Sequence, residues 1–242
     1  MKKLLTIFLF LITVSISAQE KVLLRFNYEK GEVFETRINT AMEITDKVNT
    51  DMVMYMLMEI LESNDDSYTT KVTFPRVTMD MEGEGKKMNY DSDMKEEDMD
   101  EEAKKMHERM GSITETIVHI EMSNRGEILN TKVIEAEEGY EYNDVGSSIV
   151  FPEEPVSVGT KWDSTKEVSG FPMKYEYTIT SIDAEKVGFD VTGTMDGIPT
   201  EVSGNGFITR DNGLLNSMDI TMIMDMFGQK MITKMSCVST KK

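Results

Sequence analysis

Short segments in which apolar and polar residues alternate run through most of this chain, and turn signals separate them. Strict alternation predicts strands that bury one face and expose the other. Two of the turns, at 124–126 and 211–213, end in glycine. The alternating segments are 32–46, 51–62, 67–82, 114–123, 127–134, 173–182, 187–195, 201–210, 214–227 and 230–238. We therefore predict a mainly β fold of antiparallel sheets, arranged as a half-barrel or a sandwich.

One segment has the period of a helix instead. Four apolar residues recur at helical spacing: Met99, Ala103, Met106 and Met110. Asp93 with Glu96 is close to a capping box, and Gly111 is a natural C-cap. Acidic residues fill the first half and basic residues the second, as the helix dipole favours. We predict one amphipathic helix at about 93–110, docked through its methionines onto a sheet.

The sequence contains an internal repeat. "KGEVF" at 30–34 lines up with "VGTKW" at 158–162, which matches Gly31 with Gly159 and Phe34 with Trp162. Further along, "RGEILN" lines up with "NGLLNS", and the residues between these anchors correspond loosely. We predict a first β unit at 19–150, carrying the helix, and a second at 151–242. The stretch "FPEEPVSVGTKWD" between them is interpreted as a joint, with Trp162 as a core plug of the second unit.

The first eighteen residues have the three parts of a secretory leader. Two lysines precede the apolar run "LLTIFLFLITVSI", and Ala18 offers a cleavage site before Gln19. The run is short for a membrane span, and no lipobox cysteine follows it. We expect a cleaved signal peptide at 1–18 and an exported protein, periplasmic or secreted, that is not an integral membrane protein.

The net charge of −18 restricts the partners of this chain. Loss of Lys2 and Lys3 with the leader makes it more negative still. Such a field repels phosphate backbones and anionic membrane surfaces, so we expect no nucleic-acid partner. The single cysteine, Cys237, excludes an internal disulfide and is interpreted as a buried apolar side chain.

Catalytic and metal motifs are weak. There is no Gly-x-Ser-x-Gly, and paired carboxylates for hydrolysis are not implied by any local spacing. His107 and His119 have the context of ordinary surface or packed residues. "DSDMKEEDMDEE" lacks the ligand and the glycine that an EF-hand needs at its fifth and sixth positions. We therefore predict no catalytic residues, no metal site and no cofactor, and no enzymatic activity.

The 22 methionines are the least ordinary part of the composition. Strand-like alternation puts those of "MVMYMLM" on one face, and a later strand repeats the pattern at 218–226. Thioethers at this spacing can hold Cu(I), because soft ligands select soft ions. Copper sites usually add His or Cys, however, and neither lies near these strands in sequence. An ordinary core and a pocket for a hydrophobic guest both remain open. The candidate ligand-binding residues are Met52, Met54, Met56, Met58, Met99, Met106 and Met110.

A resemblance to a known family rests on the second half of the chain. The pattern Pro-x-x-Pro-Val-x-Val-Gly-x-x-Trp, a glycine-rich strand and Asp-x-x-Gly-Leu-Leu resembles the DUF6263-type family of exported bacterial proteins of unknown function. The patterned residues are Pro152, Pro155, Val156, Val158, Gly159, Trp162, Gly204, Gly206, Asp211, Gly213, Leu214 and Leu215. The resemblance implies no activity. A looser, fold-level similarity is to LolA-like periplasmic carriers, which are open half-barrels with helices on the concave side.

These features favour a non-enzymatic exported binding protein whose methionine-lined face accepts a hydrophobic ligand, lipid-like or peptide. The alternative is a structural or protein-interaction module of the cell envelope, with no small-molecule ligand and an envelope protein as its partner.

Overall fold

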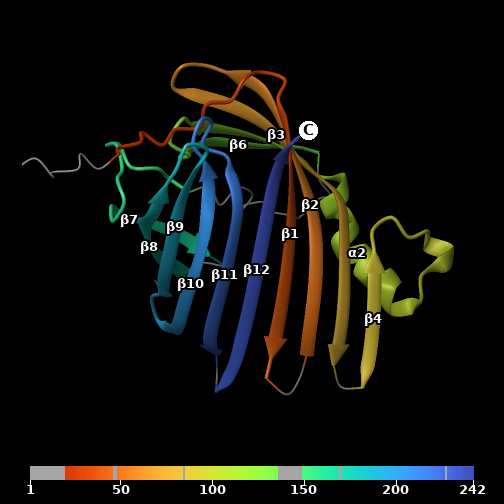
Figure 1. Cartoon of the computed structure of the whole chain (residues 1–242). Coiled ribbons are helices and arrows are strands. Elements are labelled where there is room, and N and C mark those ends of the chain that lie inside the picture. The colour runs from red at the N-terminus through yellow and green to blue at the C-terminus, as the bar shows by residue number, and fades with distance from the viewer. Residues whose placement is uncertain (1–19, 46–47, 84, 136–148, 169–170, 227) are drawn as a thin grey trace, which may run out of the picture.

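One antiparallel sheet dominates the computed structural model, which describes residues 20–242 except 46–47, 84, 136–148, 169–170 and 227 (Figure 1). Twelve strands lie within the described residues. Those of the first half are β1 (Val33–Ile44), β2 (Val48–Ser63), β3 (Ser67–Gly83), β4 (Lys86–Asp91), β5 (Ile117–Ser123) and β6 (Ile128–Glu135). Those of the second half are β7 (Lys161–Val168), β8 (Phe171–Ile182), β9 (Lys186–Met195), β10 (Ile198–Thr209), β11 (Leu215–Met226) and β12 (Gln229–Lys241). The predicted mainly β fold is confirmed.

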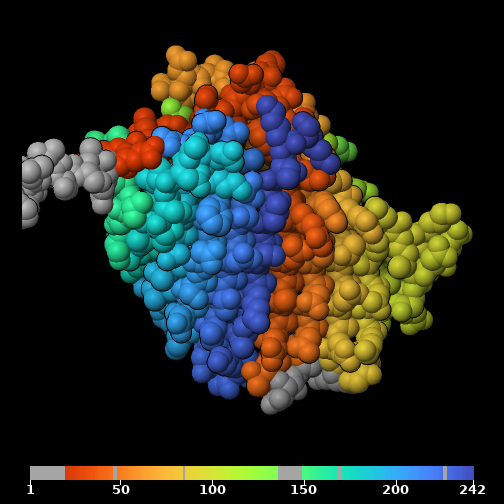
Figure 2. All heavy atoms as spheres, in the orientation of Figure 1, coloured from red at the N-terminus to blue at the C-terminus, as the bar shows by residue number. Residues whose placement is uncertain are grey.

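The first and last strands meet in the middle of the sheet. The order is β6-β5-β3-β2-β1-β12-β11-β10-β9-β8-β7, with β4 attached to β3. The pairing of β1 with β12 runs from Phe34 opposite Lys241 to Ile44 opposite Met231. Figure 2 shows them side by side, β12 in dark blue and β1 in red-orange. A single open sheet with edges at β6 and β7 fits the half-barrel, the first of the two predicted arrangements.

The two faces of the sheet differ in what lies on them. Side chains of the first face carry the buried core, and the helix and the segments before β1 and β7 pack on it; we call it the covered face. Its residues include Phe34, Met54, Ile60, Val72, Val118, Tyr177, Phe189, Val191, Met218 and Cys237. The other, open face alternates with it along each strand. Figure 2 shows the open face, with the strands uncovered.

Two extended segments cross the covered face at one end of the strands. Residues 22–28 precede β1, residues 149–156 precede β7, and they join each other through an antiparallel bridge between Val22 and Val156, with N–H to O distances of 2.9 and 2.8 Å. Leu24 and Phe151 of these crossing segments are each 1% exposed and pack over β8, β9 and β10. The segments therefore close the core that a single open sheet leaves exposed.

The two halves repeat the same local structure. The N–H of Gly31 donates to the carbonyl of Ile60, and that of Gly159 to Ile179, both over 2.8 Å. The matched aromatic residues also occupy equivalent places: Phe34 lies opposite Met58 and Trp162 opposite Tyr177. Ile60 and Ile179 are thus structurally equivalent. The loose sequence alignment between the anchors differs from this equivalence by one residue. The sheet is built from two related units, as predicted.

The helix was predicted in the first unit, and this is confirmed, but its predicted bounds are wrong. A single 3-10 turn, η1 (Glu96–Asp98), precedes α2 (Glu101–Glu115). The N-cap is Asp100, whose Oδ1 accepts the N–H of Ala103 over 2.8 Å, rather than Asp93. The helix also continues through Gly111 to Glu115, where Thr116 caps it by donating its hydroxyl to Ser112 O over 2.6 Å. Capping by these neighbours, together with packing, outweighs the low helix propensity of glycine.

Candidate functional site

The four predicted methionines of β2 lie on the covered face. Met52, Met54, Met56 and Met58 are all half-buried. The last three pack against the core cluster that contains Phe34 and Tyr28, while Met52 is the cross-strand partner of Met79. The alternation in "MVMYMLM" therefore gives a single face, as expected for a strand.

The helix methionines form a separate packed group. Met99 and Ala103 are buried against Tyr90 of β4, with Met106 and Met110 beside them. This packing docks the apolar face of α2 onto β4. Met79 packs against the same group, so it links the helix methionines to Met52 of β2.

The methionine face continues across the middle of the sheet. Two rows of cross-strand neighbours follow from the pairing: Met52, Thr40, Met235 and Ile220 in one, and Met54, Ile38, Cys237 and Met218 in the other. We call these eight residues the sulfur patch. Seven of them are half-buried, and Cys237 is 6% exposed. Burial raises the pKa of the Cys237 thiol, an effect partly offset by a hydrogen bond from the backbone of Met218.

Neither the helix nor the crossing segments cover the sulfur patch fully. The contacts of α2 are with β3 and β4, and the crossing segments pack at one end of β8–β10 and of β1–β5. The middle of β1, β12 and β11 lies between them. At the end that the crossing segments cover, Phe34 and Phe189 are buried, whereas seven of the eight patch residues in the middle are half-buried.

Two glycines of β10 border the patch. Gly204 is the partner of Ile220 and Gly206 that of Met218. A Cβ on Gly204 would come within 2.3 Å of the carbonyl oxygen of Asp219, and one on Gly206 within 2.6 Å of the Phe189 ring. Glycine is therefore required where the strands approach this closely.

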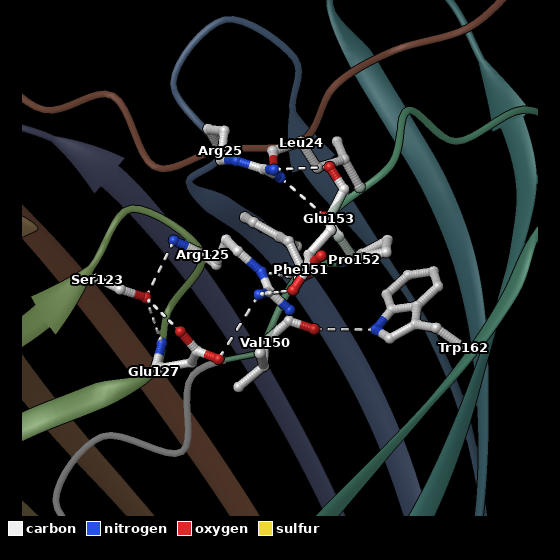
Figure 3. A network of polar contacts seen from close by, with 10 residues as sticks. All are labelled: Leu24, Arg25, Ser123, Arg125, Glu127, Val150, Phe151, Pro152, Glu153 and Trp162. Carbon is white, nitrogen blue, oxygen red and sulfur yellow. Dashed lines mark hydrogen bonds and ion pairs between the residues drawn. The ribbon is translucent and has the colours of Figure 1, made fainter. Parts of the chain in front are cut away.

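A clasp of arginines fixes the second crossing segment (Figure 3). Arg25 donates from Nη1 to Pro152 O and from Nη2 to Glu153 O, both over 2.8 Å. Arg125 donates from Nε to Phe151 O over 2.9 Å and pairs through Nη1 with the Glu153 carboxylate over 3.0 Å. Burial first, and then the charge of Arg125, lowers the pKa of Arg25. The predicted joint is thus a structural element held by its backbone carbonyls.

The predicted role of Trp162 as a core plug is only partly correct. Its ring stacks on Tyr177 with centroids 5.0 Å apart, and its Nε1 donates to Val150 O over 3.0 Å. The side chain is half-buried, whereas its counterpart Phe34 is 1% exposed. The indole therefore anchors the crossing segment from the side instead of filling the core.

The residues weighed for catalysis or metal binding are dispersed. His107 lies on α2, with its Nδ1 3.2 Å from the hydroxyl of Tyr90, and His119 lies on β5 opposite Lys132. Among the described residues, no group of three or more His, Cys, Asp or Glu side chains is placed to hold a metal ion. No helix of the described chain is long and apolar enough to span a membrane.

A hollow that the sequence analysis did not consider lies over the middle of the sheet. It has a volume of ≈880 Å³ and crosses β2, β1, β12, β11, β10 and β9. Two rows of mostly short polar side chains border it: Val53, Asn39, Ser236, Asp219, Asn205 and Asp190 in one, and Asp51, Ala41, Lys234, Thr221, Ser203 and Thr192 in the other. The sequence contained a signal for this hollow, because polar residues such as Asp219 and Thr221 alternate with the methionines of β11.

Sequence reasoning also missed the position of Cys237 relative to the methionines. Cys237 is distant from the methionine strands in sequence, yet it lies opposite Met218 in the β11–β12 hairpin. The turn between β11 and β12 contains Gly228 at φ +76°. Pairing the residues of the two strands one by one from this turn places Cys237 opposite Met218, so the sequence contained the signal.

Comparisons with known proteins add little to this geometry. No protein-family model matches the sequence, and no curated protein matches it. A solved structure of a DUF1329 family protein from Desulfovibrio piger ATCC 29098 is similar over 88% of this chain and 85% of its own, with 5% sequence identity and a TM-score of 0.22. That similarity is too low to support any conclusion about function. The resemblance to the DUF6263-type family stays a prediction.

Proposed function

We propose that this chain is an exported, non-enzymatic binding protein that holds a hydrophobic ligand, lipid-like or peptide, against its methionine-lined face. The observation that supports the proposal most is the half-burial of Met52 and Met54 in the middle of a covered face, between the crossing segments at one end and α2 at one side. Seven half-buried side chains there leave apolar surface open to solvent. A ligand that covered this surface would gain the free energy of its burial, about 25 cal/mol per Å².

The chemistry of methionine suits a guest of variable shape. Its unbranched, flexible side chain fills irregular gaps and is used on promiscuous binding surfaces. Met54, Met56 and Met58 contact the main core on one side, and Met52 contacts Met79 beside the helix group. The proposed ligand would lie along β2 and β1, between the helix and the crossing segments.

Export and family membership belong to the same proposal. The leader-like residues 1–18 lie outside the described residues, so the secretory address rests on their sequence. The pattern from Pro152 to Leu215 favours the DUF6263-type family. Edman sequencing or intact mass of protein recovered from its host should show a new N-terminus at Gln19.

The binding proposal is tested on protein purified from its host without detergent. Organic extracts examined by mass spectrometry should contain an apolar compound in near-stoichiometric amount, and a fluorescent fatty-acid probe should bind the delipidated chain. Met52→Gln and Met54→Gln should each weaken probe binding by about tenfold, because each places a polar amide in the apolar contact. Leu129→Gln, at a residue 55% exposed on β6, is the matched control. Ligand-free extracts together with no probe uptake would refute the proposal.

A second candidate is a module that binds an envelope protein. The observation that favours it is edge strand β6, whose eight residues are all exposed and include four large apolar side chains: Ile128, Leu129, Val133 and Ile134. An exposed apolar edge can add a strand from a partner. Crosslinking in the host should then recover one stoichiometric partner from the wild type and lose it in Leu129→Lys.

A further inference from the structure

Three sulfur-bearing residues lie on the covered face where β11 and β12 pair. Cys237 lies directly opposite Met218, and Met235 lies two residues before Cys237 on the same face. Opposite residues on one face of an antiparallel pair have Cβ atoms about 4.5–5.5 Å apart, and diagonal neighbours about 7–8 Å. Residues two apart on a strand are separated by about 6.8 Å. The three sulfur-bearing side chains thus form a compact triangle.

The triangle lies at the border of the packed core. Cys237 and Met235 belong to none of the four packed clusters of the described chain, while Met218 borders one of them. Met218 and Met235 are half-buried. Cys237 is 6% exposed, so it is shielded from bulk water, and the two flanking methionines are more exposed than it is.

We propose that Cys237, Met218 and Met235 form a binding site for a single soft monovalent cation, Cu(I). Thiolate and thioether ligands select Cu(I) over harder ions. Neither His107 nor His119 lies near the triangle, so the ligand set consists of sulfur alone. Methionine's three rotatable bonds allow both thioethers to turn toward an ion bound at the thiolate. On binding, the thiol loses its proton to solvent and a Cu–S bond replaces the S–H bond, with no change in oxidation state.

The site is distinct from the hydrophobic-ligand proposal, although both use the same face. That proposal depends on Met52 and Met54 of β2, whereas the copper ligands are on β11 and β12. Substitutions at Met52 and Met54 leave the copper ligands in place, and substitutions at the copper ligands leave Met52 and Met54 in place. The two proposals can therefore fail independently of each other.

The experiment is an anaerobic titration of the purified full chain with Cu(I), in competition with a chromogenic Cu(I) chelator. The wild type should bind one equivalent, and X-ray absorption should show sulfur-only coordination. Cys237→Ser and Cys237→Ala should each lower the affinity at least about 100-fold, and Met218→Leu and Met235→Leu about 10-fold each, at or above the loss caused by removing an outer-shell partner. Met173→Leu, a buried methionine of another cluster, is the matched control and should bind as the wild type does.

Met→Leu substitutions nearly conserve volume, so they keep the fold while removing the ligand atom. Circular dichroism of each variant checks this before the titration. Binding of Cu(I) should also raise the unfolding midpoint of the wild type and not of Cys237→Ala, because a ligand that binds only the folded state stabilises it. Equal affinity in the wild type and both Cys237 variants would overturn the proposal. Oxygen or nitrogen ligands in the absorption spectrum would overturn it as well.

Discussion

The indole Nε1 of Trp162 donates a hydrogen bond over 3.0 Å to the backbone carbonyl of Val150. The bond joins the first strand of the second unit to the crossing segment that precedes it (Figure 3). It shows how a residue that is only half-buried holds the segment that closes the core.

Two substitutions of Trp162 distinguish the contribution of its hydrogen bond to stability from that of its ring packing. Trp162→Phe keeps an aromatic ring on Tyr177 and should lower the free energy of unfolding by about 1 kcal/mol, the typical net value of one hydrogen bond. Trp162→Ala also loses the stacked ring and should cost about 3 kcal/mol. Urea unfolding followed by circular dichroism measures both, since the chain has no other tryptophan for fluorescence. An unchanged free energy of unfolding in Trp162→Phe would show that the hydrogen bond contributes nothing, and equal losses in the two variants would show that the stacked ring contributes nothing.

The turn glycines fall into two classes that substitution should separate. Gly126 and Gly213 have φ values of +96° and +71°, and a Cβ would come within 2.5 Å of Ile149 O or 2.4 Å of Arg25 O. Gly31 and Gly159 have similar φ values, but no atom lies within 4 Å of their Cβ positions.

Alanine at Gly31 or Gly159 should lower the free energy of unfolding by about 1–2 kcal/mol, the cost of holding a residue with a Cβ in the left-handed backbone conformation. Alanine at Gly126 or Gly213 must also displace a crossing segment, so its cost should exceed that of the first pair by at least about 1 kcal/mol. Thermal and urea unfolding of the four variants give the comparison. The explanation fails if all four lose the same stability.

The arginine clasp should depend more on backbone carbonyls than on its ion pair. Arg125→Met removes the donor to Phe151 O and should cost about 1–3 kcal/mol, because a carbonyl beside the buried Phe151 loses its partner. Glu153→Gln should cost less than about 1 kcal/mol, since this side chain is 78% exposed. Limited proteolysis should cut the Arg125→Met chain near 149–156 faster than the Glu153→Gln chain.

The stability contributed by Asp91 should depend on pH. A hydrogen bond from Arg76, over 2.6 Å to Oδ2, lowers the pKa of Asp91 below its ordinary value of 3.8. A carboxyl whose folded pKa is depressed stabilises the fold fully above its unfolded pKa and loses this contribution as the pH falls through the folded pKa.

The difference in unfolding free energy between wild type and Asp91→Asn should therefore be constant from pH 7 to about pH 5 and shrink below pH 3.8. Urea titrations at a series of pH values measure it, and other carboxyls cancel in the difference. Arg76→Gln should remove the same pH dependence. A difference that persists unchanged at pH 2.5 would contradict the assignment.

The fold class was predictable because its signals are local. Alternation in "MVMYMLM" assigns Met52 to Met58 to one face, and glycines at Gly31 and Gly159 mark equivalent turns in two units. The helix bounds were not predictable from Asp93 and Gly111, because both residues have strong cap character and the choice of cap depends on where β4 ends. Trp162 and Phe34 match in sequence and in strand position, yet only packing decided that Phe34 is buried and Trp162 is half-buried.

The alternating pattern, the turn glycines and the concentration of methionine on one strand face are properties of the sequence by itself, since each depends on residues near one another in the chain. The meeting of β1 with β12 is a property of the tertiary structure, since it joins the two ends of the chain and no local pattern encodes it. That pairing places Ile38 between Met54 and Cys237, and it unites the methionines of both units in one patch. The patch stays half-open because the crossing segments lie at one end of the covered face and α2 lies at one side, a result of packing among segments far apart in sequence.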